Sequence, residues 1–191
     1  GLNTAVGASA GLAVTTGVQN VLIGALAGDA LTSSNDNTAV GYRALSNATT
    51  GNENTAIGHT ALFTNILSDR NVAVGVDALS VHNQATSVDS YNVAVGYAAG
   101  EKVTTGVENT LIGALAGDAL TDADFNVAIG RGALTTDTLG SRSVAVGKNA
   151  LATQNFTTAT SVNNTAVGYE AGFGTTTGID NCLFGSNAGY A

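Results

Sequence analysis

One five-residue motif, Asn-[Thr/Val]-Ala-[Val/Ile]-Gly, recurs from one end of this chain to the other and limits what the chain can fold into. Eight of the ten intervals between successive copies have a 17-residue spacing, as from Asn3 to Asn20, and the two that follow Asn71 and Ser143 have a 21-residue spacing. A fixed period of this length is typical of a solenoid, in which each repeat forms one coil and stacks on the next. The sequence therefore predicts about eleven coils, which begin at Asn3, Asn20, Asn37, Asn54, Asn71, Asn92, Asn109, Asn126, Ser143, Asn164 and Asn181.

The residue types within the repeat favour β-strands over helices. If the Asn is numbered position 0, positions 1 and 3 hold mainly Thr, Val and Ile, whereas positions 2 and 4 hold mainly Ala and Gly. Small and β-branched residues that alternate in this way are typical of a strand. A helix is disfavoured, because the Gly at position 4 of every copy would cost it about 1 kcal/mol. We therefore predict an all-β parallel solenoid with two short strands per coil, the second at positions 7 and 8, joined by polar turns.

The repeat continues from residue 1 to residue 191, so we predict a single continuous solenoid region. The sequence starts in the middle of the pattern and contains no Met, which predicts a fragment of a longer chain. No stretch approaches the roughly 20 apolar residues of a membrane helix, so we expect no membrane insertion in this segment. Position 8 changes between Gly and Leu in blocks, which indicates either duplication of a block of coils or a change in coil cross-section.

The two faces of the predicted strand differ in the size of their side chains. We expect the branched residues at positions 1 and 3 to fill the interior, and the Ala/Gly face to allow close approach of another chain. Burial of a large aliphatic side chain contributes ~1.5–3 kcal/mol, whereas ordering each residue costs ~1.5 kcal/mol. With about three such side chains per coil, a single chain is under-supported, so we predict a homo-oligomer. Its contact face would contain Ala5, Ala39, Ala56, Ala73, Ala94, Ala128, Ala145 and Ala166.

The Asn at position 0 predicts a ladder of side-chain amides that bond up and down the stack. Such ladders stabilise a stack of strands when they are continuous. Ser143 is the one break in the row. The ladder is expected to contain Asn3, Asn20, Asn37, Asn54, Asn71, Asn92, Asn109, Asn126, Asn164 and Asn181.

The segment Ser143-Val144-Ala145-Val146-Gly147 resembles the Ser-Val-Ala-Ile-Gly core of head-domain repeats in trimeric autotransporter adhesins. Copies such as residues 37–45 resemble the Asn-Thr-Ala-Val-Gly repeat regions of phage tail fibres and of chaperone-terminated surface proteins. The resemblance covers essentially the whole chain. It implies a left-handed β-roll, assembled as an intertwined or side-by-side homotrimer on an extracellular fibre, with positions 1 and 3 toward the interior and position 2 toward the trimer. The 17-residue coil is longer than is usual in the adhesins.

The two 21-residue coils are the predicted functional site. Each carries four extra residues, and insertions in a solenoid form loops, often on a binding face. One interpretation is a surface turn that tolerates insertions. The other is a loop that contacts a receptor, for which we expect contacts from His82, Asn83, Gln84, Gln154, Asn155 and Phe156.

Composition and motifs argue against several other functions. The net charge is −8 and the six Lys and Arg are scattered, which disfavours a nucleic-acid partner. No motif indicates an enzyme or a bound cofactor, since neither His has a recurring Ser, Cys or Asp partner. Asp118, Asp122 and Asp124 match no calcium-loop spacing and are predicted to form a solvated turn, without a metal. Cys182 is predicted to be a small buried residue, and the aromatic residues at positions 5 and 9 are expected to cover apolar neighbours.

Together these features predict a non-enzymatic, extracellular segment of a trimeric fibre on a virion or a bacterial cell surface. It would project and stiffen, and it would contact a glycan or protein receptor through the long coils. The alternatives are a purely structural spacer or a self-assembling filament and, from another class, an ice-binding solenoid. Ice binding needs a continuous exposed row of Thr, whereas the Thr at position 1 is interrupted by Val and is assigned to the interior.

Overall fold

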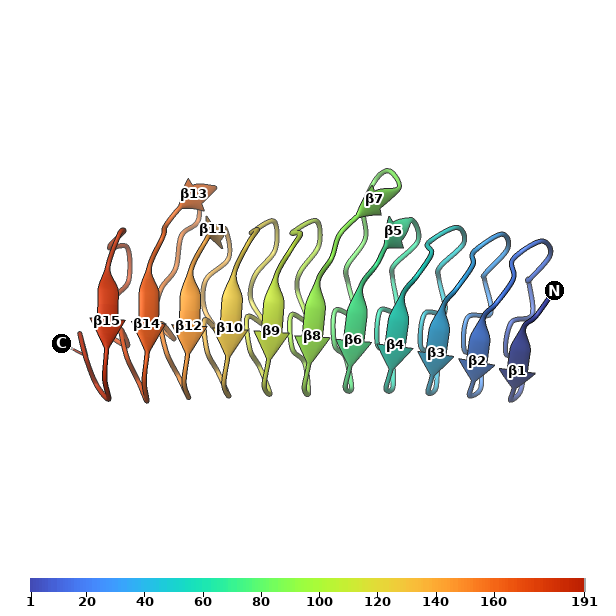
Figure 1. The fold of residues 1–191 in the computed structure, drawn as a ribbon, viewed down its shortest axis with the longest axis horizontal. Coiled ribbons are helices and arrows are strands. Elements are labelled where there is room, and N and C mark those ends of the chain that lie inside the picture. Colours follow the sequence, from blue (N-terminus) through green and yellow to red (C-terminus); the bar gives the residue numbers. More distant parts are fainter. Residues whose placement is uncertain (191) are drawn as a thin grey trace.

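Each copy of the motif forms a three-residue strand in the computed structural model, which describes residues 1–190. The strands join into one 11-stranded parallel sheet that runs the length of the molecule (Figure 1). The chain is thus a parallel β-solenoid of about eleven coils, as the repeat predicts. The sheet consists of β1 (Thr4–Val6), β2 (Val21–Ile23), β3 (Thr38–Val40), β4 (Thr55–Ile57), β6 (Val72–Val74), β8 (Val93–Val95), β9 (Thr110–Ile112), β10 (Val127–Ile129), β12 (Val144–Val146), β14 (Thr165–Val167) and β15 (Cys182–Phe184).

Equivalent residues lie opposite each other in neighbouring strands. Ala39 in β3 pairs with Ala56 in β4, and the register continues across a 21-residue coil, where Val72 in β6 pairs with Val93 in β8. The extra residues therefore leave the sheet undisturbed. They bring two further pairs of two-residue parallel strands, which are β5 (Ser68–Asp69) with β7 (Val88–Asp89) and β11 (Gly140–Ser141) with β13 (Thr160–Ser161).

The second strand predicted at positions 7 and 8 does not form, because these positions lie in turns. The backbone has positive φ at positions 6 and 8, for example 57° at Arg43 and 53° at Leu45. This left-handed conformation bends the chain and ends a strand. Hydrogen bonds to the neighbouring coils continue through the turn, since Arg43 donates to the carbonyl of Ala25 and Leu45 to that of Ala61, both at 3.0 Å.

The Gly at position 4 marks the tightest packing between coils. Gly41 has a φ of 137°, and a Cβ atom on it would stand 2.4 Å from the carbonyl oxygen of Gly58 in the next coil. Only glycine combines this backbone conformation with so close an approach. The motif therefore ends in Gly for a steric reason that repeats wherever another coil follows.

The strand faces are the reverse of those predicted. The alanines at position 2 point into the interior of their own chain, whereas the branched residues at positions 1 and 3 point outward, with Ile23 40% and Ile57 39% exposed. An alanine with no exposed surface in one chain cannot contact a second chain, so the predicted contact face has to be corrected. The completely buried alanines are Ala39, Ala56, Ala73, Ala94, Ala128, Ala145 and Ala166, while Ala5 is exposed in the first coil, which has a neighbour on one side only.

The narrowness of the coil explains this reversal. The side-chain Nδ2 of Asn109 donates to the carbonyl of Ala123 at 2.8 Å, across the coil from the strand to the opposite wall. With the two walls so close, most coils have room at position 2 only for Ala. The larger β-branched side chains of the strand are therefore placed outside.

The asparagines at position 0 form a hydrogen-bonded ladder through this interior. The Oδ1 of Asn92 accepts the backbone N–H of Asn109 at 3.0 Å and its Nδ2–H at 3.1 Å. Together with the bond from Asn109 to the opposite wall, each such residue ties coil to coil and wall to wall. The buried amides are thereby paired, which is what makes their burial tolerable.

Positions 2, 8 and 11 share one volume of the interior, so a large side chain at one of them is accompanied by a small one at another. A Cβ atom on Gly28 would stand 2.7 Å both from Cδ2 of Leu22 and from Cδ1 of Leu31. Coils with Leu at position 8 have Ala at position 2 instead, as in the pair Ala39 and Leu45. The blocks of Gly and Leu at position 8 therefore follow a packing requirement that extends to the next coil. Where a coil has Ala at position 2 as well as Gly at position 8, as at Ala94 and Gly100, Leu111 of the following coil takes the space. The coils with Leu at position 2 contain the pairs Leu22 and Gly28, Leu111 and Gly117, and Leu183 and Gly189.

Candidate functional site

The 21-residue coils project from the same edge of the solenoid. In Figure 1 the segments around β7 and β13 rise above the row of regular coils, both at the top of the view. Four coil steps separate them along the sequence, which corresponds to roughly 19 Å at ~4.8 Å per step. We call residues 84–89 the first bulge and residues 156–161 the second bulge.

The exposed residues of the bulges differ from most of those predicted as receptor contacts. The tips expose Ala85, Thr86 and Ser87 in the first bulge and Thr157, Thr158 and Ala159 in the second. Of the predicted residues, His82 and Gln154 are completely buried, Phe156 is 9% exposed, Asn83 and Gln84 are half-buried, and Asn155 is exposed.

Position 11 explains why two of these predictions fail. His82 and Gln154 both occupy this position, which faces the interior and holds Leu31 and Leu120 in regular coils. The polar side chains at position 11 suggested surface loops, but the apolar residues elsewhere in the same row were the signal that could have placed them inside. Neither His82 nor Gln154 can contact a receptor in this conformation.

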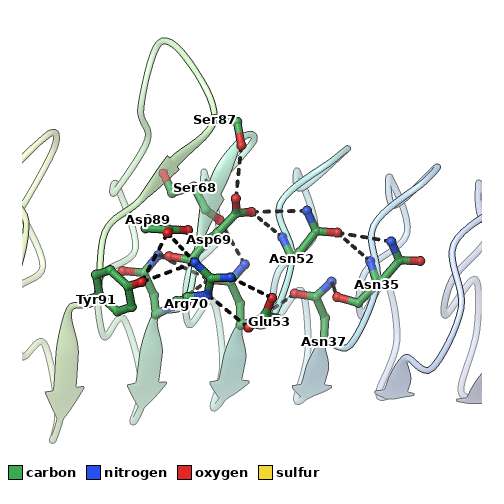
Figure 2. A network of polar contacts seen from close by, with 12 residues as sticks. Asn35, Asn37, Asn52, Glu53, Ser68, Asp69, Arg70, Ser87, Asp89 and Tyr91 are labelled. Atoms are coloured by element: carbon green, nitrogen blue, oxygen red, sulfur yellow. Dashed lines mark hydrogen bonds and ion pairs between the residues drawn. The ribbon is translucent and has the colours of Figure 1, made fainter.

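A chain of polar contacts attaches the first bulge to the coils before it (Figure 2). The Oδ2 of Asp69 accepts the hydroxyl of Ser87 in the bulge at 3.0 Å, and its Oδ1 accepts the N–H of Asn52 at 2.6 Å. The Oδ1 of Asn52 in turn accepts the N–H of Asn35 at 2.9 Å. The tip of the bulge is thus connected to the surface of three successive coils.

Arg70 lies between the first bulge and the preceding coil (Figure 2). Its guanidinium pairs with Glu53, with Nε 3.0 Å from Oε2, and with Asp89 in the bulge. Hydrogen bonds to Glu53 and to Tyr91 raise the pKa of Arg70 above its usual value. Because these groups are exposed, the ion pairs contribute little to global stability, and their main effect is to position the bulge.

The second bulge has an arginine at the same place. Arg142 precedes Ser143 as Arg70 precedes Asn71, and its Nη1 donates to the hydroxyl of Ser161 at 3.2 Å. Its guanidinium carbon lies 5.8 Å from the ring centroid of Phe125. An arginine at position 16 therefore comes directly before each long coil, a signal in the sequence that the prediction of contact residues did not use.

A closed polar network fills the interior beneath the second bulge. The Nε2 of Gln154 donates to Oδ2 of Asp137 at 2.6 Å and to Oγ of Ser143 at 3.0 Å, and its Oε1 accepts Nδ2–H of Asn164 at 2.8 Å. The Oδ1 of Asp137 also accepts the N–H of Phe156 at 2.9 Å. Gln154 thus carries the ladder across Ser143, the one coil that lacks the Asn.

His82 occupies the place of Gln154 beneath the first bulge but has no such partners. Both of its ring nitrogens are buried without a hydrogen bond. Asn65, which precedes it in the row, bonds within its own turn to the carbonyl of Ser68 at 3.0 Å. Burial lowers the pKa of His82 from 6.5 to about 4. The backbone of Thr104 opposes this shift, but its geometry falls short of a hydrogen bond to the ring, so burial decides the direction.

The aromatic side chains lie against neighbours in adjacent coils. The rings of Tyr42 and His59 stack with centroids 5.4 Å apart, and those of Phe173 and Tyr190 with centroids 5.2 Å apart. The ring of Tyr169 has the Nζ of Lys148 5.2 Å from its centroid. One face of these rings is thus already occupied within the chain, which leaves less of it for a sugar to stack on.

Residues 1–190 form no pocket, and they contain no group of three His, Cys, Asp or Glu side chains that could hold a metal ion. The acidic residues considered above are each engaged elsewhere: Asp118 accepts the hydroxyl of Thr135, Asp122 that of Thr105 and Asp124 the N–H of Val107. Cys182 is exposed rather than buried, because position 1 faces outward. None of the described segments is a helix able to cross a membrane.

Comparison with protein-family models gave no match, and searches of the curated proteins and of the solved structures gave none either.

Proposed function

We propose that this chain is a segment of an extracellular fibre or adhesin, a shaft of three copies on a virion or a bacterial cell surface that contacts a receptor through its bulges. The observation that carries the proposal is the outer face of the 11-stranded sheet, where position 3 is apolar in every coil and position 1 holds uncharged Thr, Val or Cys, although the interior of the coil is already filled. Large exposed apolar surfaces mark sites of association. The number three and the left-handed winding rest on the resemblance to trimeric adhesin heads and phage tail fibres.

The outer sheet face is formed by positions 1 and 3. It contains no charged residue in any coil, and charged residues are depleted in the same way at the cores of protein interfaces. At ~4.8 Å per strand it extends for roughly 50 Å. Its more exposed residues at position 3 are Val6, Ile23, Ile57, Ile112, Ile129 and Phe184.

A second copy of the same chain fits this face better than an unrelated surface. Two or three parallel copies share the same spacing between coils, so that each row of Val and Ile can meet an equivalent row along its whole length. Cyclic arrangements of this kind close on themselves and stop at a defined number of copies. The outer sheet face, and not the alanine face predicted from the sequence, is therefore the proposed surface of contact between copies.

Analytical ultracentrifugation tests this step. We expect the wild-type chain to sediment as a trimer, and Ile57→Asp with Ile112→Asp to sediment as a monomer that keeps its β-sheet circular dichroism. The control is Thr16→Asp with Thr50→Asp, which adds two charges at exposed turn positions away from the outer sheet face and should leave the trimer intact. A folded wild-type monomer at tens of micromolar would rule out the proposed assembly.

The bulges are proposed as the receptor contacts because they project from the shaft and expose Thr and Ser side chains. Deletion of residues 85–88 and of residues 157–160 shortens each long coil to the regular 17-residue length. We expect the deleted form to assemble but to lose attachment to host cells or to a glycan array. Unchanged attachment would instead favour the alternative that this segment is a structural spacer and that another part of the fibre binds the receptor.

The outward direction of position 1 also gives the ice-binding alternative one supporting observation. The row holds Thr in five coils, Val in five and Cys in one, in no regular order, and position 3 holds no hydroxyl in any coil. A face with so few hydroxyl groups is better suited to packing against protein. Thermal hysteresis in a solution of the purified chain would reverse this preference.

A further inference from the structure

The two long coils use the same interior position in opposite ways. Gln154 makes three hydrogen bonds beneath the second bulge, whereas His82 makes none with its ring beneath the first. A buried polar group without a partner costs free energy that a hydrogen-bonded one does not. Of the two groups, only the imidazole can change its charge at mildly acidic pH.

We propose that the first long coil is an acid-sensitive element, in which protonated His82 leaves the interior and releases the first bulge while the second bulge stays closed. This inference rests on the interior of the coil and holds whether or not the bulges bind a receptor. A charged imidazolium cannot remain where both ring nitrogens are desolvated and unpaired. The low-energy response is to bring it to water, and the segment that carries it must then move.

The segment that would move begins with Asn83 and Gln84, which follow His82 and lead into the first bulge. The N–H of Asn83 donates to the carbonyl of Thr104 at 2.9 Å. Gln84 donates through its backbone to Oγ of Ser68 at 3.2 Å and through Nε2 to the carbonyl of Thr105 at 2.6 Å. These bonds tie Asn83 and Gln84 to the coils on both sides. Rotation of His82 out of the core pulls on all three, because they belong to the two residues that follow it.

The charged groups around His82 do not stabilise its protonated form. Asp69 in the preceding coil bonds to Asn52 and Ser87, and Asp89 in the bulge pairs with Arg70. Lys102 in the following coil is exposed. The neighbours of His82 in its own row are Asn65 and Val103, both neutral, and no ionised group contributes to the shift of its pKa.

The direction of the pH effect follows from these surroundings. The pKa of His82 is about 4 in the closed coil and 6.5 when the side chain is free, so the open form binds the proton more tightly. Opening is therefore favoured as the pH falls below 6.5, and the effect levels off below about 4. Over the range from pH 7 to 4 we expect the opening equilibrium of the first bulge to rise roughly 100-fold.

Hydrogen–deuterium exchange of the assembled chain tests the proposal, with rates corrected for the intrinsic effect of pH. Peptides that cover residues 80–91 should show the rise in opening, and peptides that cover residues 152–163 should not. The second bulge thus serves as a control in the same molecule, and no variant is needed for this comparison. Equal responses of the two bulges, or no response of either between pH 7 and 4, would overturn the inference.

Two variants separate His82 from the other titratable groups. His82→Gln introduces the residue found at position 11 of the second long coil and should abolish the pH response of residues 80–91. His59→Gln removes the exposed imidazole and should leave the response unchanged. If His82→Gln retains the acid response of the first bulge, another group is responsible and the proposal is wrong.

Discussion

The Cδ2 atom of Leu22 lies 2.7 Å from the point at which a Cβ atom on Gly28 would stand. These two residues therefore share one volume in the interior, and the next coil fills the equivalent volume with Ala39 and Leu45. The backbone at the two positions is the same, since φ is 54° at Gly28 and 53° at Leu45. Side-chain size alone decides which arrangement a coil can have.

This relationship predicts a strong coupling between substitutions in one coil. Gly28→Leu alone should destabilise the chain by about 1–3 kcal/mol through overpacking, and Leu22→Ala alone by about 2–5 kcal/mol through a cavity. The triple variant Leu22→Ala, Gly28→Leu and Leu31→Ala reproduces the Ala39, Leu45 and Ala48 set of the following coil, and it should recover most of this loss. Urea unfolding of the wild type, the three single variants (Leu31→Ala included) and the triple variant measures the coupling. Purely additive losses would show that the coils do not exchange volume in this way.

The Gly at position 4 predicts a second contrast. Gly41→Ala should destabilise the chain by more than about 3 kcal/mol, because its methyl group would overlap the Gly58 carbonyl and its φ is disfavoured for alanine. Gly185→Ala has a similar backbone strain at a φ of 117° but nothing within 4 Å of the new methyl group, so we expect about 1–3 kcal/mol. Thermal unfolding measures both variants. Similar losses would mean that strain alone, and not the close approach of the coils, requires glycine.

The architecture could be predicted from the sequence because a strict period leaves few alternatives. The parallel sheet, its register and the stacking of about eleven coils all follow from the repeated motif. The face assignment failed because alternation shows which residues share a face but not which face is inside. Two features of the sequence indicate which face is inside. The Asn at position 0 shares a face with the Ala at position 2. Positions 2 and 8 also vary together, since Leu22 occurs with Gly28 whereas Ala39 occurs with Leu45.

The interior ladder predicts a third result. Asn109→Ala removes the partners of the Asn126 N–H and of the Ala123 carbonyl, and two buried groups without partners should cost about 2–4 kcal/mol. Asn47→Ala is the matched control, since within residues 1–190 the side-chain amide of Asn47 makes no hydrogen bond and is half-buried. Chemical denaturation should separate the two variants clearly. Equal effects would mean that the ladder contributes no more than an ordinary surface amide.

The closed network beneath the second bulge predicts a fourth. Gln154→Ala leaves Oδ2 of Asp137, Oγ of Ser143 and Nδ2 of Asn164 without their shared partner, so we expect a loss of about 2–4 kcal/mol. Gln154→Glu keeps the size but replaces a donor with an acceptor next to the Asp137 carboxylate. It should therefore be destabilising at neutral pH and less so in acid, where a carboxyl is protonated. A pH series of unfolding curves distinguishes the two variants.

The buried imidazole predicts how global stability depends on pH. The pKa of His82 is about 4 in the fold and 6.5 in the unfolded chain, so its contribution is complete above 6.5 and is lost as the pH falls toward 4. A shift of this size corresponds to about 3 kcal/mol. The difference in unfolding free energy between wild type and His82→Gln should change by this amount between pH 7 and 4. A pH-independent difference would mean that His82 is solvated in the folded chain.

The site was harder to predict than the fold because the extra residues of a long coil obscure which of its residues continue the rows of the regular coils. The lengths of the two long coils identified where the surface is interrupted, and Asn155 was placed correctly outside. His82 and Gln154 look like loop residues by composition, but they continue an interior row whose other members are mostly apolar. The arginines that precede both long coils, Arg70 and Arg142, carried information about the bulges that a search for catalytic or metal-binding motifs does not detect.

The alternation of inward and outward residues has a consequence for the ways in which such a shaft can change its length. Gain or loss of one residue within a strand would turn Val or Ile inward against a wall that in most coils has room only for Ala, and the neighbouring strands would have to adjust. Gain or loss of a whole 17-residue repeat would bring one Asn to the place of another and leave each contact as it was. The length of the shaft therefore changes in steps of one coil, each of about 4.8 Å.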